Sequence, residues 1–227
     1  MNISSYPYEF AIRAAAVLGS ELEASVTLHE HGLSVRAGSS TDAAARCDQA
    51  EALAADGPCI DAMEQDTTLV VREIPQEPRW REWQEQVARE RFVSAMAVPA
   101  PVDDDTAVAL NLYSRTPDPW TPGLVRAAEA YARLLAAAVR LHMEVAAVGE
   151  SASGVYSSMS DAKAVERAVG AIMHTNGCPE DEARRILLTA CTNRNVTQRE
   201  VAETILRALV LGDSPRAGSG AGSRGRG

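Results

Sequence analysis

Residues 161–209 read DAKAVERAVGAIMHTNGCPEDEARRILLTACTNRNVTQREVAETILRAL, and this stretch decides the fold of the C-terminal part. Its apolar residues recur every three to four positions, which is the period of an amphipathic α-helix. Asn176-Gly177 is typical of a helix C-terminus, and Thr197-x-x-Glu200 is a capping box that begins a new helix. The stretch therefore predicts three short helices. Because such short helices are marginal alone in water, we expect them to pack as one compact bundle.

Two weaker signals support these boundaries. Ser158-x-x-Asp161 resembles a capping box before the first helix, although Asp stands where Glu is usual. Pro179 lies where the first turn of the second helix tolerates a proline, and the acidic residues that follow complement the positive end of that helix. The three-helix domain is thus expected over 158–211. The Gly-, Ser- and Arg-rich residues 212–227 are expected to form a disordered tail.

Residues 1–120 follow a different period. Side chains alternate between apolar and polar over Ala24–His29 and Leu33–Ala37, on either side of a turn that contains Gly32, and this pattern predicts a β-hairpin. Other short β-branched or alternating runs predict strands, and runs with a helical period predict helices. The strands are expected at Thr67–Val71, Ala95–Pro99 and Ala107–Ser114, and the helices at Tyr8–Leu18, Thr41–Ala55 and Pro78–Arg91. This order predicts an α+β domain, in which helices flank an antiparallel sheet.

The longest helical segment is expected over Thr121–Val148, within a connecting region that runs from 121 to 157. We expect it to pair with a copy of itself in a parallel dimer, because its apolar stripe outlasts the domain that it leaves. The alternative is that it only packs on its own sheet. Gly149–Ser158 is expected to break or loosen the helix and to serve as the joint between the two domains. The apolar stripe consists of Leu124, Ala127, Ala128, Tyr131, Leu134, Leu135, Ala138, Leu141, Val145 and Val148.

Composition argues against a membrane protein and against a disulfide or zinc scaffold. Hydrophobic residues make up 46% of the 227, which is enough for ordinary cores, but no stretch of about 18 uncharged apolar residues occurs. The N-terminal residues lack the basic and apolar parts of a secretory signal, so we expect a cytoplasmic protein. The four cysteines form no Cys-x-x-Cys pair, and the four histidines have no recognisable metal spacing. We therefore expect neither a metal site nor a cofactor.

Charge is spread unevenly along the chain, whose net charge is −9. Residues 1–150 hold 12 basic and 23 acidic residues, whereas residues 151–211 hold 7 of each, and the tail has 3 basic residues and 1 acidic residue. The N-terminal part should repel polyanions, and the C-terminal part tolerates them.

The helical segment resembles the ANTAR module of bacterial antitermination regulators. The first-helix string VERAVGAIM at 165–173 carries this resemblance, and the residues at the family's later offsets are Gly177, Glu182-Ala183, Leu187, Asn195 and Val201-Ala202. The preceding part resembles the GAF-like domain that often stands before this module in actinobacterial proteins. Its matching strings are Gly57-Pro58-Cys59-Ile60-Asp61-Ala62, Arg79-Trp80 and Leu110-Asn111-Leu112-Tyr113-Ser114. The resemblance implies a sensor coupled to an RNA binder that prevents terminator hairpin formation, usually as a dimer.

Several positions depart from the family pattern. Val169 replaces a usual lysine, Arg184 replaces a common aromatic, and Leu188 replaces a usual basic residue. Where the family favours a basic pair and a leucine after its asparagine, this chain has Val196-Thr197-Gln198. Since phosphate contacts depend on basic groups, these losses leave a second hypothesis open. It is a dimeric small-molecule or protein-interaction sensor whose bundle no longer binds RNA.

If the module binds RNA hairpin loops, basic and amide side chains must contact phosphates and splayed bases. The backbone amides at the start of the third helix also favour a phosphate, so the neighbouring Arg194, Asn195 and Arg199 are the preferred candidates. By contrast, Ala168, Gly170, Met173, Ala183 and Ala202 are expected to be packing residues. The complete set of candidate RNA contacts is Lys163, Arg167, Arg185, Arg194, Asn195 and Arg199.

The N-terminal part shows no catalytic constellation. It has no Cys–His–acid set, no phosphate loop and no nucleotide fingerprint, so we expect no enzyme. An enzymatic alternative would need Cys47 and Cys59, the only thiols in this part. A small molecule or a protein could act as the signal. Trp80, Trp83 and Tyr113 are candidates for lining a ligand pocket, although aromatic residues at such spacing are more often core residues.

Overall fold

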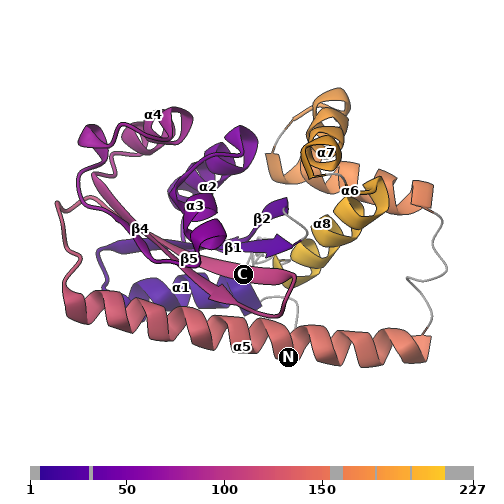
Figure 1. The fold of residues 1–227 in the computed structure, drawn as a ribbon, viewed down its shortest axis with the longest axis horizontal. Helices are drawn as coiled ribbons and strands as arrows, with labels where there is room; N and C mark the ends of the chain where they lie inside the picture. Colours follow the sequence, from indigo (N-terminus) through magenta and orange to yellow (C-terminus); the bar gives the residue numbers. More distant parts are fainter. Residues whose placement is uncertain (1–5, 31–32, 154–160, 177, 195, 213–227) are drawn as a thin grey trace, which may run out of the picture.

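The computed structural model describes residues 6–30, 33–153, 161–176, 178–194 and 196–212. A five-stranded antiparallel sheet with helices on both faces comes first, a long helix follows it, and further helices form the C-terminal part (Figure 1). The predicted α+β fold class is confirmed.

The sheet has the strand order β2-β1-β5-β4-β3. Strand β1 and strand β2 form the hairpin that the alternating pattern predicts, and a register shift between Val26 and Thr27 marks a bulge in it. Strands β4 and β5 form a second antiparallel pair, and the short β3 closes the other edge. The strands are β1 (Leu22–Glu30), β2 (Leu33–Ser39), β3 (Leu69–Val71), β4 (Ser94–Pro101) and β5 (Thr106–Ser114).

Two helices cover one face of the sheet and three cover the other (Figure 1). Helices α1 (Tyr6–Leu18) and α5 (Pro122–Ser153) lie on the first face. Helices α2 (Asp42–Ala54), α3 (Pro58–Gln65) and α4 (Arg81–Arg89) lie on the second, and a short 3₁₀ helix, η2, spans Ile74–Gln76. The hydroxyl of Thr41 accepts the N–H of Ala44, so Thr41 is the N-cap of α2.

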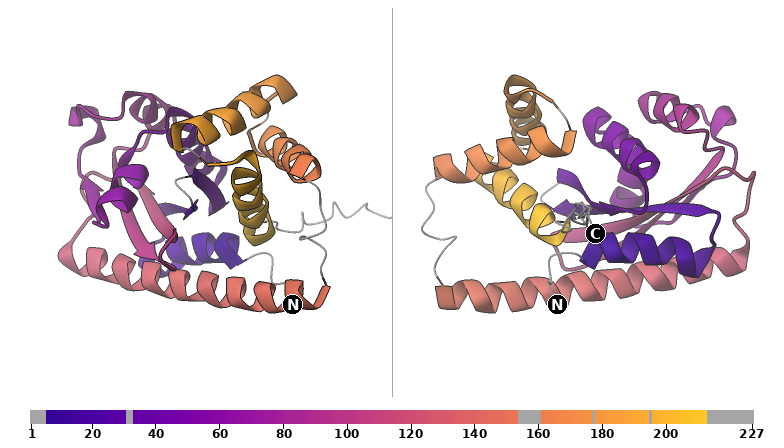
Figure 2. Two further views of the ribbon diagram at one scale, coloured as in Figure 1. Left: turned by 45° about the vertical axis from the view of Figure 1, so that its right-hand side comes forward. Right: turned by 180° about the vertical axis from the view of Figure 1, so that it is seen from behind.

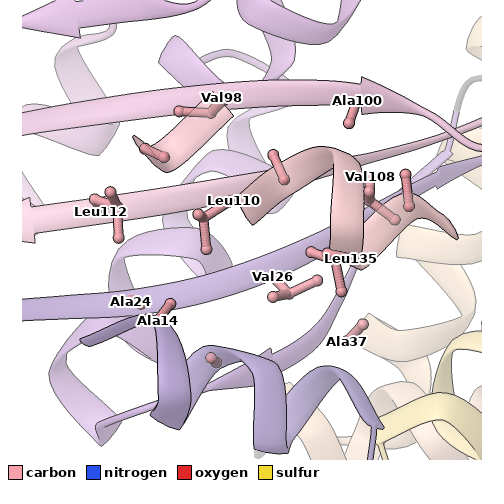
Figure 3. Close-up of a cluster of buried hydrophobic side chains, with 14 of the residues drawn as sticks. Ala14, Ala24, Val26, Ala37, Val98, Ala100, Val108, Leu110, Leu112 and Leu135 are labelled. Carbon is pink, nitrogen blue, oxygen red and sulfur yellow. The ribbon is translucent and has the colours of Figure 1, made fainter. Parts of the chain in front are cut away.

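The main core lies between the sheet and the pair α1 and α5 (Figure 3). Because side chains alternate along a strand, Val98, Leu110 and Leu112 point toward this layer. Leu135 of α5 and Ala14 of α1 meet them from the helix side, and all five side chains are buried. The intervening residues of the same strands face α2, α3 and α4, so both faces of the sheet are covered.

Helix α5 continues through Gly149 to Ser153, so the predicted break at Gly149 is wrong. A glycine inside a helix costs about 1 kcal/mol relative to alanine, and this cost does not by itself end a long helix. The rest of the predicted joint, 154–158, lies outside the described residues.

Three helices form the C-terminal bundle: α6 (Asp161–Asn176), α7 (Glu180–Arg194) and α8 (Gln198–Gly212). The predicted capping box is present at the start of α8. The N–H of Thr197 donates to Glu200 Oε2 at 2.7 Å, and the N–H of Glu200 donates to Thr197 Oγ1 at 3.2 Å. Helix α8 also packs against β2 and α1 of the first domain (Figure 2). Ser158, the first residue of the other proposed capping box, and the tail 213–227 lie outside the described residues, and Gly212 is the last residue of α8.

Candidate functional site

One face of α6 carries basic side chains toward solvent. Lys163, Arg167, Gly170 and His174 follow one another at helical spacing, and all four are exposed. Since residues four and seven apart lie on the same side of a helix, the three side chains form one exposed row, interrupted only at Gly170. We call these four residues the α6 stripe. The other side of α6 is buried in the bundle core.

The bundle core consists mostly of small and aliphatic residues. Ala168, Ala183 and Ala202 are fully buried in it, and Met173 packs against it, as predicted. Gly170 is the exception, because it is exposed and a Cβ placed on it would meet no atom within 4 Å. The prediction that Gly170 is a packing residue is therefore wrong. The buried core comprises Ala164, Ala168, Val169, Ile172, Ala183, Leu187, Val201, Ala202 and Ile205.

Arg199 joins two helices of the bundle. Its Nη1 donates to Asp161 Oδ1 at 2.6 Å, at the start of α6, and its Nε donates to Glu203 Oε1 at 2.7 Å, one turn along α8. These two hydrogen bonds raise the pKa of the Arg199 guanidinium. Its positive charge therefore faces two carboxylates, and a phosphate would have to compete with both of them.

Arg185 lies on the outer face of α7 and is exposed. It lines a shallow hollow together with the neighbouring Arg184. The Nε of Arg184 donates to Glu180 Oε1 at 2.8 Å. The side chain of Arg194 and the whole of Asn195 lie outside the described residues. The hollow is lined by Asp181, Arg184, Arg185, Leu188, Thr189 and Thr192.

The first domain contains a buried polar cluster that the sequence reasoning missed. Asp48 of α2 is 4% exposed, and it accepts hydrogen bonds from four side chains on the sheet. Ser25 Oγ, Asn111 Nδ2 and Tyr113 Oη donate to its Oδ1 at 2.7, 3.2 and 2.8 Å, and Thr27 Oγ1 donates to Oδ2 at 3.2 Å. Burial raises the pKa of Asp48, against the hydrogen bonds from Ser25 and Tyr113, which lower it.

A second buried carboxyl lies one turn further along α2. Glu51 is 3% exposed, and its Oε1 accepts the backbone N–H of Cys59 at 2.8 Å, at the start of α3. A Cβ on Gly57 would lie 2.2 Å from Glu51 Oε1, so only glycine leaves room for this carboxyl. Burial first, and the charge of Asp48 second, raise the pKa of Glu51 well above its ordinary value. The carboxyl of Glu51 thus serves as the cap of α3.

The aromatic candidates for a ligand pocket are core residues. Trp80, Trp83 and Tyr113 are 4%, 0% and 1% exposed, and the two tryptophan rings meet edge to face with centroids 5.9 Å apart. Trp80 Nε1 donates to Asp61 Oδ2 at 3.1 Å. The thiols of Cys47 and Cys59 are buried, and burial raises the pKa of both.

Helix α5 carries a second apolar face, which points to solvent. The single stripe that the sequence suggests is divided, since Ala128, Ala132 and Leu135 pack on the sheet. Leu134 and Leu141 are 58% and 62% exposed. With the exposed Ala127, Ala130 and Ala137 they follow the alternating three- and four-residue spacing of a coiled-coil seam. We call these five residues the α5 seam. Of the described residues, none belongs to a helix long and apolar enough to span a membrane, and none belongs to a metal-binding cluster of His, Cys, Asp and Glu.

Solved structures of bacterial domains are similar to part of this chain. The chain is similar to a domain of a two-component sensor histidine kinase protein from Sinorhizobium meliloti 1021, with a TM-score of 0.48 and 17% identity, over 61% of this chain and 92% of that one. It is also similar to the GAF domain region of a membrane protein from Geobacter sulfurreducens PCA, with a TM-score of 0.40 and 14% identity, over 59% of this chain and 94% of that one. No curated protein matches the sequence.

The sequence itself matches two domain families in succession. Residues 156–206 match the ANTAR domain, and they include α6, α7 and the first half of α8. Residues 10–139 match the GAF domain, and they include the whole sheet, α2, α3 and α4, most of α1 and the first part of α5. The chain therefore belongs to the GAF family and combines its GAF domain with a C-terminal ANTAR domain, as the resemblance in the sequence predicted.

Proposed function

We propose that this chain is a cytoplasmic RNA-binding regulator of transcription antitermination, in which the GAF domain controls the ANTAR domain. The RNA partner is a hairpin loop in a nascent transcript. The α6 stripe is the observation that carries the proposal, because it presents basic side chains on one exposed face of the ANTAR domain. We place the domain limits at 1–120 for the sensor, 121–157 for the connecting helix and joint, and 158–211 for the RNA-binding domain.

The geometry of the stripe suits a single RNA strand. Lys163, Arg167 and His174 extend over about 16 Å of helix, since each residue adds about 1.5 Å of rise. Loop nucleotides offer phosphates to such a row and leave their unstacked bases free for hydrogen bonds. Among the six candidates from the sequence, Lys163 and Arg167 share this row, whereas Arg185 lies on α7. Arg199 contributes after a phosphate replaces Asp161 or Glu203, and Arg194 and Asn195 stay candidates from the sequence.

Two copies of the chain act together in this proposal. The α5 seam places Leu134 and Leu141 toward solvent, where a second seam would bury them. Arg126, Arg133 and Arg140 flank the seam on one side and are exposed. In an antiparallel pair these arginines would face their own copies across the interface, and like charges would repel. A parallel pair avoids this repulsion, so we propose a parallel homodimer.

The signal enters at the GAF domain, as a small molecule or a protein. It must bind one arrangement of the dimer more tightly than another in order to act. Helix α5 is the physical connection, because one of its faces packs on the sheet and its other face is the seam. A shift of α5 would change the spacing of the two ANTAR domains.

A second candidate function is a dimeric small-molecule or protein-interaction sensor whose ANTAR domain binds no RNA. Two observations favour it. Arg199 and Arg184 face carboxylates within their own domain, and residues 151–211 hold as many acidic as basic residues. This reading keeps the dimer and the signal but replaces the RNA partner.

RNA binding can be tested with a labelled transcript that carries two tandem hairpins. Fluorescence anisotropy at 50–200 mM salt should show an affinity that falls steeply as salt rises. Lys163→Ala and Arg167→Ala should each weaken binding and reduce the salt slope by about one. Arg13→Ala is the matched control, because Arg13 is an exposed arginine of α1. Absence of binding even at 50 mM salt would favour the second candidate.

The dimer can be tested by light scattering. The wild-type chain should have twice the mass of one copy at micromolar concentration, and the double substitution of Leu134 and Leu141 by Asp should halve it. Leu53→Asp is the control, because Leu53 is 52% exposed on α2, on the opposite face of the sheet. A wild-type monomer, or a double variant that stays dimeric, would refute the seam.

A further inference from the structure

Gly170 lies in the interior of α6, as the tenth of its 16 residues. Glycine is among the least favourable residues in a helix interior, because its backbone loses the most freedom on folding. A glycine at this position therefore lowers the stability of the helix. Some other requirement has to explain it.

The fold itself supplies no such requirement. Gly170 lies within the regular α-helix α6, whereas Gly19 and Gly57 have positive φ angles of 159° and 160°. A Cβ on Gly170 would meet no atom within 4 Å, so no neighbouring helix needs the space. Gly57 shows the contrast, since a Cβ there would collide with Glu51. An alanine at 170 would fit the folded chain.

The position of Gly170 points outward, to the α6 stripe. It lies between Arg167, three residues before it, and His174, four residues after it, on the same exposed face. The absence of a side chain leaves the helix backbone uncovered in the middle of a basic row. A partner that is drawn in by the cations could approach the helix axis more closely here than anywhere else along the row.

We propose that Gly170 is the point of closest contact with RNA, where the sugar–phosphate strand of the loop lies directly against the backbone of α6. This inference rests on the proposed RNA-binding function. Lys163, Arg167 and His174 would hold phosphates on either side of the contact, and the Cα hydrogens of Gly170 can donate weak hydrogen bonds to phosphate or ribose oxygens. A methyl group at this point would lift the strand away from Lys163, Arg167 and His174 at once.

The test is a substitution that strengthens the helix and weakens binding. Gly170→Ala in the full chain should raise the melting temperature of the ANTAR domain by a few degrees, because alanine is the better helix former. The same variant should weaken binding of the tandem-hairpin RNA by tenfold or more, and Gly170→Gln should weaken it further. The salt slope should stay that of the wild type, because neither variant changes a charge.

Ala162 supplies the matched control, because it is exposed on a different face of α6. Ala162→Gln should leave RNA affinity within twofold of the wild type. Equal affinity of Gly170→Ala and the wild type overturns the inference and leaves the proposed function standing. A lower melting temperature for Gly170→Ala also overturns it, since the fold would then need the glycine. Absence of RNA binding by the wild type refutes the proposed function, and the inference falls with it.

Discussion

The two domains place their polar chemistry in opposite locations. In the GAF domain a carboxylate, a second carboxyl and several hydroxyl and amide groups are buried between α2, α3 and the sheet. In the described part of the ANTAR domain, Thr204 is the one buried polar residue, and the cations of the α6 stripe are exposed. A buried polar group that loses its partner is costly, so the GAF core is specific and sensitive to substitution. The ANTAR core is apolar and tolerant, and in our proposal the surface of this domain carries the recognition chemistry.

The largest effect should come from Asp48→Ala. This change removes the acceptor of Ser25, Thr27 and Tyr113 and leaves their hydroxyls buried. Because each buried unpaired donor costs about 1–3 kcal/mol, we expect a loss of about 3 kcal/mol or more in the free energy of unfolding of the GAF domain. Urea denaturation followed by circular dichroism measures it.

Asp42→Ala is the control for that experiment, because Asp42 is an exposed acid in the first turn of the same helix. We expect it to cost less than about 1 kcal/mol, as is usual for a charge near a helix N-terminus. Similar losses for the two variants would show that the buried cluster contributes little, and the contrast between the domains would disappear.

Gly57→Ala should have the next largest effect. Its Cβ would lie within 2.2 Å of Glu51 Oε1 and 2.4 Å of Glu51 Cγ, so the buried carboxyl would have to leave its place at the start of α3. We expect a loss of about 2 kcal/mol, in the range for overpacked cores. Gly123→Ala in the first turn of α5 is the control, since its Cβ would have 3.8 Å to the nearest atom. Thermal melts that rank the two variants equally would contradict this geometry.

Glu51→Gln should alter how stability depends on pH. Burial and the charge of Asp48 raise the pKa of Glu51 in the folded chain, so the folded state keeps a proton that the unfolded state loses. The stabilisation is complete below the ordinary pKa of a glutamate and is lost as pH rises toward the raised pKa. The Gln variant should therefore match the wild type near pH 4 and exceed its melting temperature increasingly above pH 5.

Glu77→Gln tests the sign of that effect. The hydrogen bond from Arg79 lowers the pKa of Glu77, so its contribution is present above the ordinary pKa and is lost as pH falls through the lowered one. This variant should be slightly less stable than the wild type at pH 7, and the gap should close in acid. A difference in melting temperature between Glu51→Gln and the wild type that stays constant from pH 4 to pH 8 would refute the account of the buried carboxyl.

The smallest effect should come from Thr204→Val in the ANTAR domain. The Thr204 hydroxyl is fully buried and donates to the carbonyl of Glu200 at 3.0 Å, one turn earlier in α8. Valine has nearly the same shape as threonine, so the substitution removes one hydrogen bond, to the carbonyl of Glu200. We expect a change within about 1 kcal/mol in the free energy of unfolding. A loss as large as that of Asp48→Ala would mean that the two cores are alike.

Local features of the fold could be predicted from the sequence, since short-range chemistry determines them. The hairpin of β1 and β2, the N-cap of α2 and the capping box of Thr197 and Glu200 each depend on a few neighbouring residues. Helix α3 does not follow from the sequence pattern, because Gly57-Pro58 is typical of a helix end, although proline is also well tolerated in the first turn of a helix.

Features that depend on distant partners could not be predicted. Asp48 and the alternating polar residues of β1 look like a solvent-facing pattern, and only the fold shows that α2 covers them. Arg199 appeared to be an available cation, but Asp161, 38 residues away, faces it in the bundle. Gly170 resembled the small packing residues beside it in sequence, because spacing alone does not show which face of a helix is left uncovered.

The most direct test of the central claim is the mass of the complex between the full chain and a two-hairpin RNA at low salt. We predict two chains bound to one RNA, with both hairpins required, and dissociation of the complex as salt rises. The double substitution of Leu134 and Leu141 by Asp should leave at most weak binding of single chains. A stable dimer without any bound RNA at 50 mM salt would contradict the assignment of this chain as an RNA-binding regulator.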